Sequence, residues 1–367
     1  MVTRRIILRT ALALAVTVAG VLGYLDVHGD FQRWSDNSAL DGACDGLLDR
    51  DVVRGVLGSG EVEVHDRGDG DLVAKCQVDV DGGGSAEVSV LDTASVAGSR
   101  DSLYRANLSD VVSVPVGHGW SGLFGADMED PKDSFDSPTE HATTSLVLDC
   151  VESSQVDGLS VTVRTKLRDA TLDNPANRPQ YARIATSTAA RVSEKLGCGA
   201  KIGKDVRRLG LPVSEDEYEP LRTAGGTCSG IPTARGVSVA TETDRGGAPY
   251  EICRLADADV STRYILSARF GPYAQEAYAD YQERSYGEGM PSPDIPSQQR
   301  DADGPVSWST AKCPDGVALF TLQAAGDRGV DRKDTAESPG FAYERAALGA
   351  FAERSAEAHR CSAPAAL

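Results

Sequence analysis

The sequence lacks the patterns that mark common metal and nucleotide sites. It has no Cys-x-x-Cys pair, and its five histidines show no ligand spacing, which argues against zinc. These histidines are His28, His65, His118, His141 and His359. A P-loop needs four residues between its first glycine and its Gly-Lys pair, but Gly199 leaves only three before Gly203. Asp205 then stands where a P-loop has Ser or Thr. We therefore expect no metal and no cofactor.

Sequence motifs of common enzymes are also missing. The chain has no Gly-x-Ser-x-Gly, no His-Glu-x-x-His and no dinucleotide-binding glycine pattern. The segment "GWSGLFG" at 119–125, next to His118, approaches a nucleophile elbow but lacks the spacing of its second glycine. A glycine-rich turn around a half-buried Trp120 explains the same residues. We therefore expect no catalytic residue, and we treat "RGD" at 67–69 as a chance match within a turn.

Acidic residues outnumber basic residues in the chain, 55 to 37. The 367 residues carry a formal net charge of −18, although Arg4, Arg5 and Arg9 precede the first acid, Asp26. The rest of the chain is therefore even more acidic than the total. Such a surface repels the phosphates of nucleic acids and anionic lipid headgroups. Nucleic acid is excluded as an expected partner.

The N-terminal stretch has the features of a membrane anchor. Basic residues precede an apolar run, and residues 6–25 would span about 30 Å as a helix, which matches the hydrocarbon layer. Positive charges stay inside, so the C-terminal bulk is exported. Ala-x-Ala patterns at 11–15 lie too early in the run for cleavage. We expect an uncleaved single-pass anchor over 1–25 in the cell membrane, with a cleaved signal peptide as the alternative, and a polar linker over 26–40.

The eight cysteines indicate disulfides, because an even number in an exported chain is typical of a disulfide framework. Cys150 and Cys198 are 48 residues apart, and so are Cys313 and Cys361. In each case the first cysteine comes just before a strand pattern and the second follows a helix pattern. The expected pairs are Cys44–Cys76, Cys150–Cys198, Cys228–Cys253 and Cys313–Cys361.

A short sequence pattern that occurs twice in the chain favours an internal duplication. Cys44 and Cys198 are each followed seven residues later by Asp-Val-x-Arg, at an offset of 154 residues. We expect one domain over 41–198 and its repeat over 199–362. Cys198 would then be a joint about which the two halves move.

Hydrophobic periodicity predicts the same order of elements in both halves. Helices are expected near 45–57, 93–107, 180–196, 201–209, 272–286 and 339–359, and strands near 61–64, 74–80, 86–90, 143–151, 158–166, 235–242, 249–256, 262–269, 305–311 and 316–324. This order predicts an α+β fold, with an antiparallel sheet in each domain and helices on one face of it.

An acidic stretch is the one insertion that sets the halves apart. Residues 126–137, "ADMEDPKDSFDS", could gather carboxylates around calcium, but they miss the regular spacing of a calcium loop. A solvated loop is the simpler interpretation.

The paired cysteines, the joint and "PVGHGWSG" at 115–122 resemble uncharacterised, membrane-anchored exported proteins of high-GC Gram-positive bacteria. The resemblance implies a cell-envelope location and assigns no role to any residue. Three hypotheses remain: a non-catalytic binding or sensing protein with an envelope partner or ligand, an envelope enzyme of another class, and a purely structural envelope protein.

Overall fold

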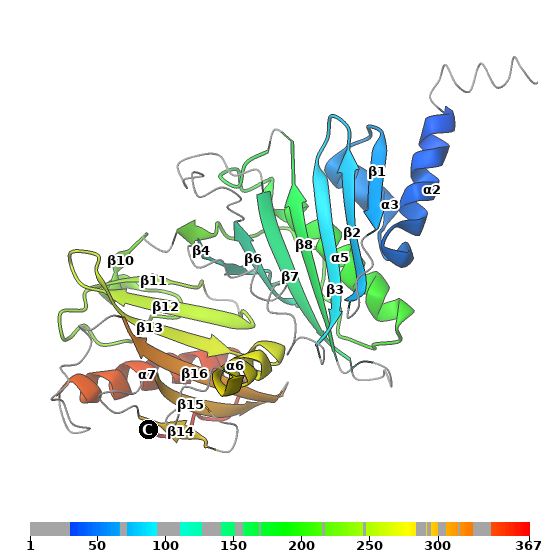
Figure 1. Cartoon of the computed structure of the whole chain (residues 1–367). Coiled ribbons are helices and arrows are strands. Elements are labelled where there is room, and N and C mark those ends of the chain that lie inside the picture. Colours follow the sequence, from blue (N-terminus) through cyan, green and yellow to red (C-terminus); the bar gives the residue numbers. More distant parts are fainter. Residues whose placement is uncertain are drawn as a thin grey trace, which may run out of the picture.

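The computed structural model contains two seven-stranded antiparallel sheets, each with helices packed beside it (Figure 1). The structure describes residues 30–66, 72–93, 111–126, 141–150, 156, 158–168, 170–214, 217–244, 247–283, 291, 295–299, 306–314, 316–325 and 339–367. The expected α+β class with tandem sheets is therefore confirmed.

The first sheet has the strand order β1-β2-β3-β8-β7-β6-β5. Its elements, with the helices beside it, are α2 (Asp30–Gly46), α3 (Arg50–Leu57), β1 (Val62–Asp66), β2 (Leu72–Val80), β3 (Ser85–Asp92), β5 (Val114–Pro115), β6 (Ser121–Ala126), β7 (His141–Asp149), β8 (Gly158–Lys166) and α5 (Arg178–Lys195). A separate short ladder joins β4 (Val111–Val112) to β9 (Val213–Ser214).

The second sheet has the order β10-β11-β12-β13-β16-β15-β14. Its elements are β10 (Glu219–Pro220), the 3₁₀ turn η2 (Leu221–Thr223), β11 (Val239–Glu242), β12 (Tyr250–Ala256), β13 (Thr262–Arg269), α6 (Pro272–Glu283), β14 (Ser297–Gln298), β15 (Val306–Cys313), β16 (Gly316–Ala324) and α7 (Pro339–Ala358).

The two sheets repeat one topology. Three consecutive antiparallel strands come first, the last strand of the half pairs with the third of them, and the strand before it follows on the far side. Thus β1-β2-β3-β8-β7 corresponds to β11-β12-β13-β16-β15, and α5 corresponds to α7. This shared strand order supports an internal duplication.

The four disulfides are the four pairs that the sequence predicts. They occupy corresponding places in the two halves. Cys76 in β2 bonds to Cys44, which precedes β1, and Cys253 in β12 bonds to Cys228, which precedes β11. Cys150 and Cys313 lie at the ends of β7 and β15 and bond to cysteines beyond the long helix. Each bond therefore stays within its own half.

The cysteines correspond between the halves as the four expected pairs imply. Cys44 corresponds to Cys228, because their partners lie in the equivalent strands β2 and β12, and Cys198 corresponds to Cys361. The sequence similarity around Cys44 and Cys198 therefore does not mark equivalent cysteines. The Asp-Val-x-Arg pattern at an offset of 154 residues has no counterpart in the fold. Residues 51–54 lie in α3, but residues 201–209 form no helix, which corrects that expectation as well.

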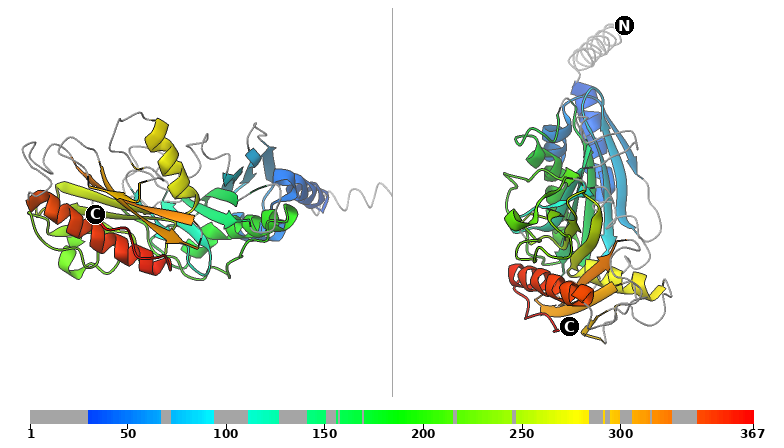
Figure 2. Two further views of the ribbon diagram at one scale, coloured as in Figure 1. Left: turned by 90° about the horizontal axis from the view of Figure 1, so that it is seen from below. Right: turned by 90° about the vertical axis from the view of Figure 1, so that its left-hand side faces the viewer.

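The expectation of helices on one face holds for α3 and α5 but is wrong for the second sheet. Side chains alternate between the faces of a strand. Phe320 of β16 packs with α7 residues such as Phe351, while its neighbour Leu319 packs with Ala277 of α6. The two helices therefore cover opposite faces of this sheet, as Figure 2 shows.

The N-terminal expectations have a mixed outcome. Residues 1–25, expected as the anchor, lie outside the described residues, and no helix in the described part of the chain combines the length and apolarity needed to cross a membrane. Residues 30–40, expected as a linker, are helical and belong to α2. Asp36 and Leu40 of this helix are buried, and Arg54 of α3 binds Asp36 at 3.3 Å, which fixes α2 to the first half.

The hairpin between β12 and β13 is closed by Asp257. Its Oδ1 accepts the backbone N–H groups of Asp259 and Ser261, each at 3.0 Å, and its Oδ2 accepts Arg263 Nη2 at 2.7 Å. The Ser261 N–H and the Arg263 side chain lower the pKa of this carboxyl, because they stabilise its charged form. A lowered pKa in the folded state stabilises the fold above the unfolded pKa, and this contribution is lost as pH falls through the folded pKa.

We therefore expect Asp257→Asn to have a lower free energy of unfolding than the wild type at pH 7. The difference between the two free energies should decrease below about pH 4. The substitution keeps the shape and one acceptor oxygen but removes the charge that binds Arg263. Urea unfolding at a series of pH values measures the difference. A difference of constant size from pH 7 to pH 2 would contradict this explanation.

Candidate functional site

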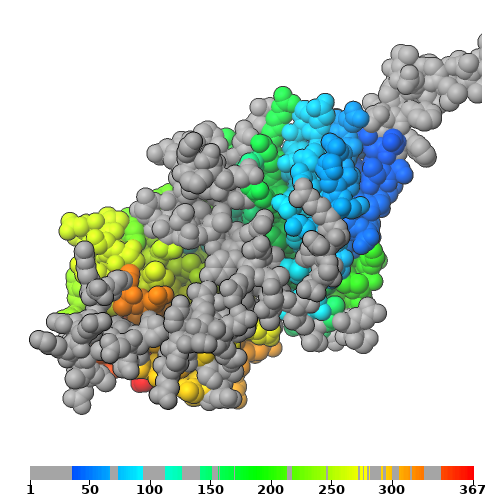
Figure 3. All heavy atoms as spheres, viewed as in Figure 1, coloured from blue at the N-terminus to red at the C-terminus, as the bar shows by residue number. Residues whose placement is uncertain are grey.

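An acidic hollow of about 650 Å³ lies beside strands β1 and β2. These strands belong to the blue and cyan part of the molecular surface in Figure 3. Glu61, Glu63, Asp79 and Asp81 contribute its charges. Glu63 and Asp79 are direct cross-strand neighbours, an arrangement that costs stability for like charges. Sequence reasoning missed this cluster, although the alternating acids of "EVEV" and "QVDVD" are its signal.

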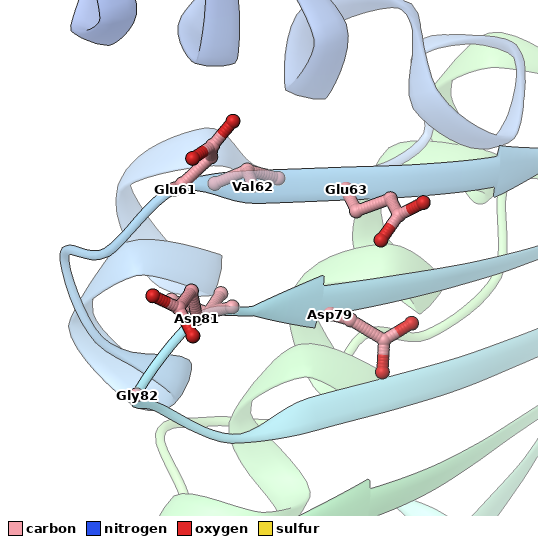
Figure 4. Close-up of a pocket in the computed structure, with 7 residues that line it drawn as sticks. Glu61, Val62, Glu63, Asp79, Asp81 and Gly82 are labelled. Atoms are coloured by element: carbon pink, nitrogen blue, oxygen red, sulfur yellow. The ribbon is translucent and has the colours of Figure 1, made fainter.

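The carboxylates of the hollow do not converge on one point (Figure 4). Those of Glu63 and Asp79 point in the same direction, but that of Glu61 points away from β2. Two of the acids also have partners, since Gln77 Nε2 donates to Asp79 at 2.9 Å and His65 lies 3.3 Å from Glu63. Among the described residues, no three His, Cys, Asp or Glu side chains are grouped to hold a metal ion. Acids along an edge strand discourage pairing with another sheet.

A buried carboxylate and an imidazole meet in the second half. Glu251 of β12 is 2 % exposed, and its two oxygens accept Ser355 Oγ at 2.6 Å and bind His359 Nε2 at 3.0 Å. The His359 ring stacks on Phe270, with ring centroids 3.5 Å apart. Ser355 binds Glu251 rather than His359, so these residues do not form the serine–histidine pair of a hydrolase. The contacts attach the end of α7 to the sheet.

Another carboxylate accepts hydrogen bonds from the backbone of a loop. Glu242 at the end of β11 accepts the backbone N–H groups of Gly225, Gly226 and Cys228 at 2.6 to 2.8 Å. Three converging N–H groups would otherwise form an anion-binding concavity, and here the protein's own carboxylate fills it. The loop that carries Cys228 is thereby held in place for its disulfide.

The turn in "PVGHGWSG" is structural in the way that the glycine-rich interpretation predicts. Trp120 N–H donates to Gly117 O at 2.9 Å and closes the turn between β5 and β6. Ser121 lies within β6, opposite Val147, and not on a strand-to-helix elbow. His118 binds Val116 O through Nδ1 at 3.1 Å. The arrangement of a hydrolase site is therefore absent at these residues.

The same turn holds the segment that follows Cys198. We call residues 199–214 the strap. Trp120 Nε1 donates to Lys204 O at 2.9 Å, and Lys204 N donates to His118 O at 2.8 Å. Leu209 of the strap is buried in the core of the first half. Cys198, itself fully buried, is therefore not the free joint that the sequence suggested.

The remaining sequence candidates lie outside the described residues. These are the RGD tripeptide at 67–69, nearly all of the acidic stretch at 126–137, of which only Ala126 is described as the end of β6, and nearly all of the helix expected at 93–107.

Comparisons of the chain with protein-family models, with curated proteins and with solved structures gave no match. The function is therefore argued from the geometry of this chain alone.

Proposed function

We propose that this protein is an extracytoplasmic, membrane-tethered binding or sensing protein of the bacterial cell envelope. The observation that carries the proposal is the set of four disulfides, one at each of two corresponding places in both halves. Disulfides persist in oxidising compartments and are rare in the cytosol. Export fits the basic and apolar N-terminus, and tethering follows if residues 1–25 are retained as a single-pass anchor.

Binding is favoured over catalysis by what the buried polar groups do. Glu251, Ser355 and His359 bind one another within the packed second half, and the Glu242 carboxylate is fully used by three backbone N–H groups. A catalytic acid or base needs access to a substrate. These groups stabilise the second sheet, its long helix and the loop of Cys228, which suits the presentation of a surface to a partner in the envelope.

Protease protection tests the location. In bacterial cells that express the full chain with a C-terminal tag, we expect the tag in the membrane fraction and its loss when protease is added to intact cells. The matched control replaces Arg4, Arg5 and Arg9 with Glu, which should abolish this orientation. Full-length protein that is protected from protease in intact cells would refute export. A tagged fragment in the medium that begins near residue 26 would refute the tether.

Cross-linking tests binding. A membrane-impermeant cross-linker applied to the same intact cells should give a discrete adduct of the tagged protein, and mass spectrometry should identify its partner. An unchanged monomer band over a range of cross-linker lengths would count against a protein-binding role.

A further inference from the structure

The fit between the strap and the first sheet is closest at Gly203. A Cβ atom built on Gly203 would lie 2.4 to 2.5 Å from three atoms of the Trp120 indole, so only glycine lets the strap cross this ring. The indole is itself 8 % exposed and packed in the core of the first half, and therefore has little freedom to shift. Arg207 N adds a contact to His118 Nε2 at 3.4 Å.

Beyond this crossing, the strap stays attached to the first half until the second half begins. Arg178 of α5 donates to Leu209 O at 3.3 Å. Val213 and Ser214 then pair with Val112 and Val111 in the β4–β9 ladder. The strap therefore decides where the chain enters the second sheet, since β10 starts at Glu219.

The two halves also meet directly, at a small apolar contact away from the strap. Leu91, Leu123 and Val147 of the first sheet pack with Ala248 and Tyr273 of the second half. The hydroxyl of Tyr273, in the first turn of α6, lies 3.5 Å from Ser145 Oγ.

Other residues of the second half pack against Tyr273 and hold its ring in place. The ring of Tyr273 stacks on that of Tyr250, with centroids 6.3 Å apart and ring planes 2° from parallel. The guanidinium of Arg269 lies 5.0 Å from the centroid of the Tyr250 ring. Among the residues that the structure describes, this apolar cluster has few members, and relative motion is the default between domains with small interfaces unless another element restrains it.

We propose that the turn Gly117–Trp120 and residues Gly203–Arg207 form a latch that fixes the orientation of the two sheets. While the latch is closed, the strap holds the second half in the position in which Tyr273 packs against the first sheet. When it opens, the strap leaves the Trp120 ring, the β4–β9 ladder separates, and the Tyr273 contact parts without unfolding of either sheet. The latch is a conformational device of the fold and does not depend on the ligand of the proposed function.

Hydrogen exchange on the full chain tests the latch with two variants. Gly203→Ala places a methyl group against the Trp120 ring, and we expect roughly tenfold faster amide exchange in the strap and at the Tyr273 contact. Trp120→Phe keeps a ring but removes the N–H donor to Lys204 O, and about fivefold faster exchange is expected there. Gly349→Ala is the matched control, because a Cβ at Gly349 of α7 meets nothing within 4 Å.

The pattern of the exchange separates the latch from ordinary destabilisation. The latch requires faster exchange in the strap and at the Tyr273 contact, with unchanged exchange in the central strands β8 and β16, and a larger radius of gyration by X-ray scattering. Equal acceleration in β8 and in the strap would overturn the proposal, since it would show global unfolding of the first half. Acceleration in the strap without any at the Tyr273 contact would overturn it too, because the strap would then not set the orientation.

Discussion

Replacing Cys150 and Cys198 together with alanine should lower the free energy of unfolding of the first half by about 4 kcal/mol. The bond closes a loop with a sequence separation of 48 residues, and the entropy of the opened loop in the unfolded chain sets this magnitude. It joins the end of β7 to the residues just after α5, so its removal takes away the covalent link between the sheet and the helix that covers it. Urea unfolding, followed by exchange of the β7 and β8 amides, measures the loss.

The matched control is the corresponding bond in the other half. Cys313→Ala with Cys361→Ala opens a loop of the same sequence separation, 48 residues, between β15 and the end of α7. We expect a loss of about the same size, now confined to the second half, because each half has its own core. Equal destabilisation of both halves by either pair of substitutions would mean that they unfold as one unit, and a loss below about 1 kcal/mol would contradict the loop-entropy explanation.

Local patterns predicted the sheets well. The bounds of β8, β13 and β16 are those expected from the sequence, because runs of strand-forming residues define each of them. The pairs Cys150–Cys198 and Cys313–Cys361 followed from their equal spacing of 48 residues, and the other two pairs followed by elimination.

The faces of the second sheet could not be predicted from alternation. Residues 317–322, "VALFTL", are apolar at almost every position, which is the pattern of a strand buried on both faces. Phe320 and Leu319 are both fully buried, one under α7 and the other under α6. That continuous run was the available signal for a second covering helix.

The strap was misread because its residues fit a helical spacing by chance. Ile202 and Val206 are four apart, yet Ile202 is 39 % exposed, while Val206 packs on the first core. Contact with Trp120, 83 positions away from Gly203 along the chain, decides the conformation. A single sequence cannot show such a contact. The same holds for Glu251 and His359, which lie 108 residues apart and share no motif.

His359→Ala should destabilise the second half by about 3 kcal/mol. The substitution leaves the carboxylate of Glu251 buried without its contact to the imidazole, while the hydrogen bond from Ser355 remains. His359→Phe separates the two roles of the ring. It retains stacking on Phe270 but has no N–H, so we expect it to lose nearly as much stability as alanine if the hydrogen bond dominates. Urea unfolding of the full chain measures each variant.

The sign of a second substitution gives the sharper test. Adding Glu251→Gln to His359→Ala replaces the isolated carboxylate with a neutral amide that can still accept from Ser355. The double variant should therefore be more stable than His359→Ala alone, although it carries one more substitution. Additive losses would show that His359 acts through its packing on Phe270, and that Glu251 does not depend on it. Recovery of stability would establish that the imidazole is there to satisfy a buried carboxylate.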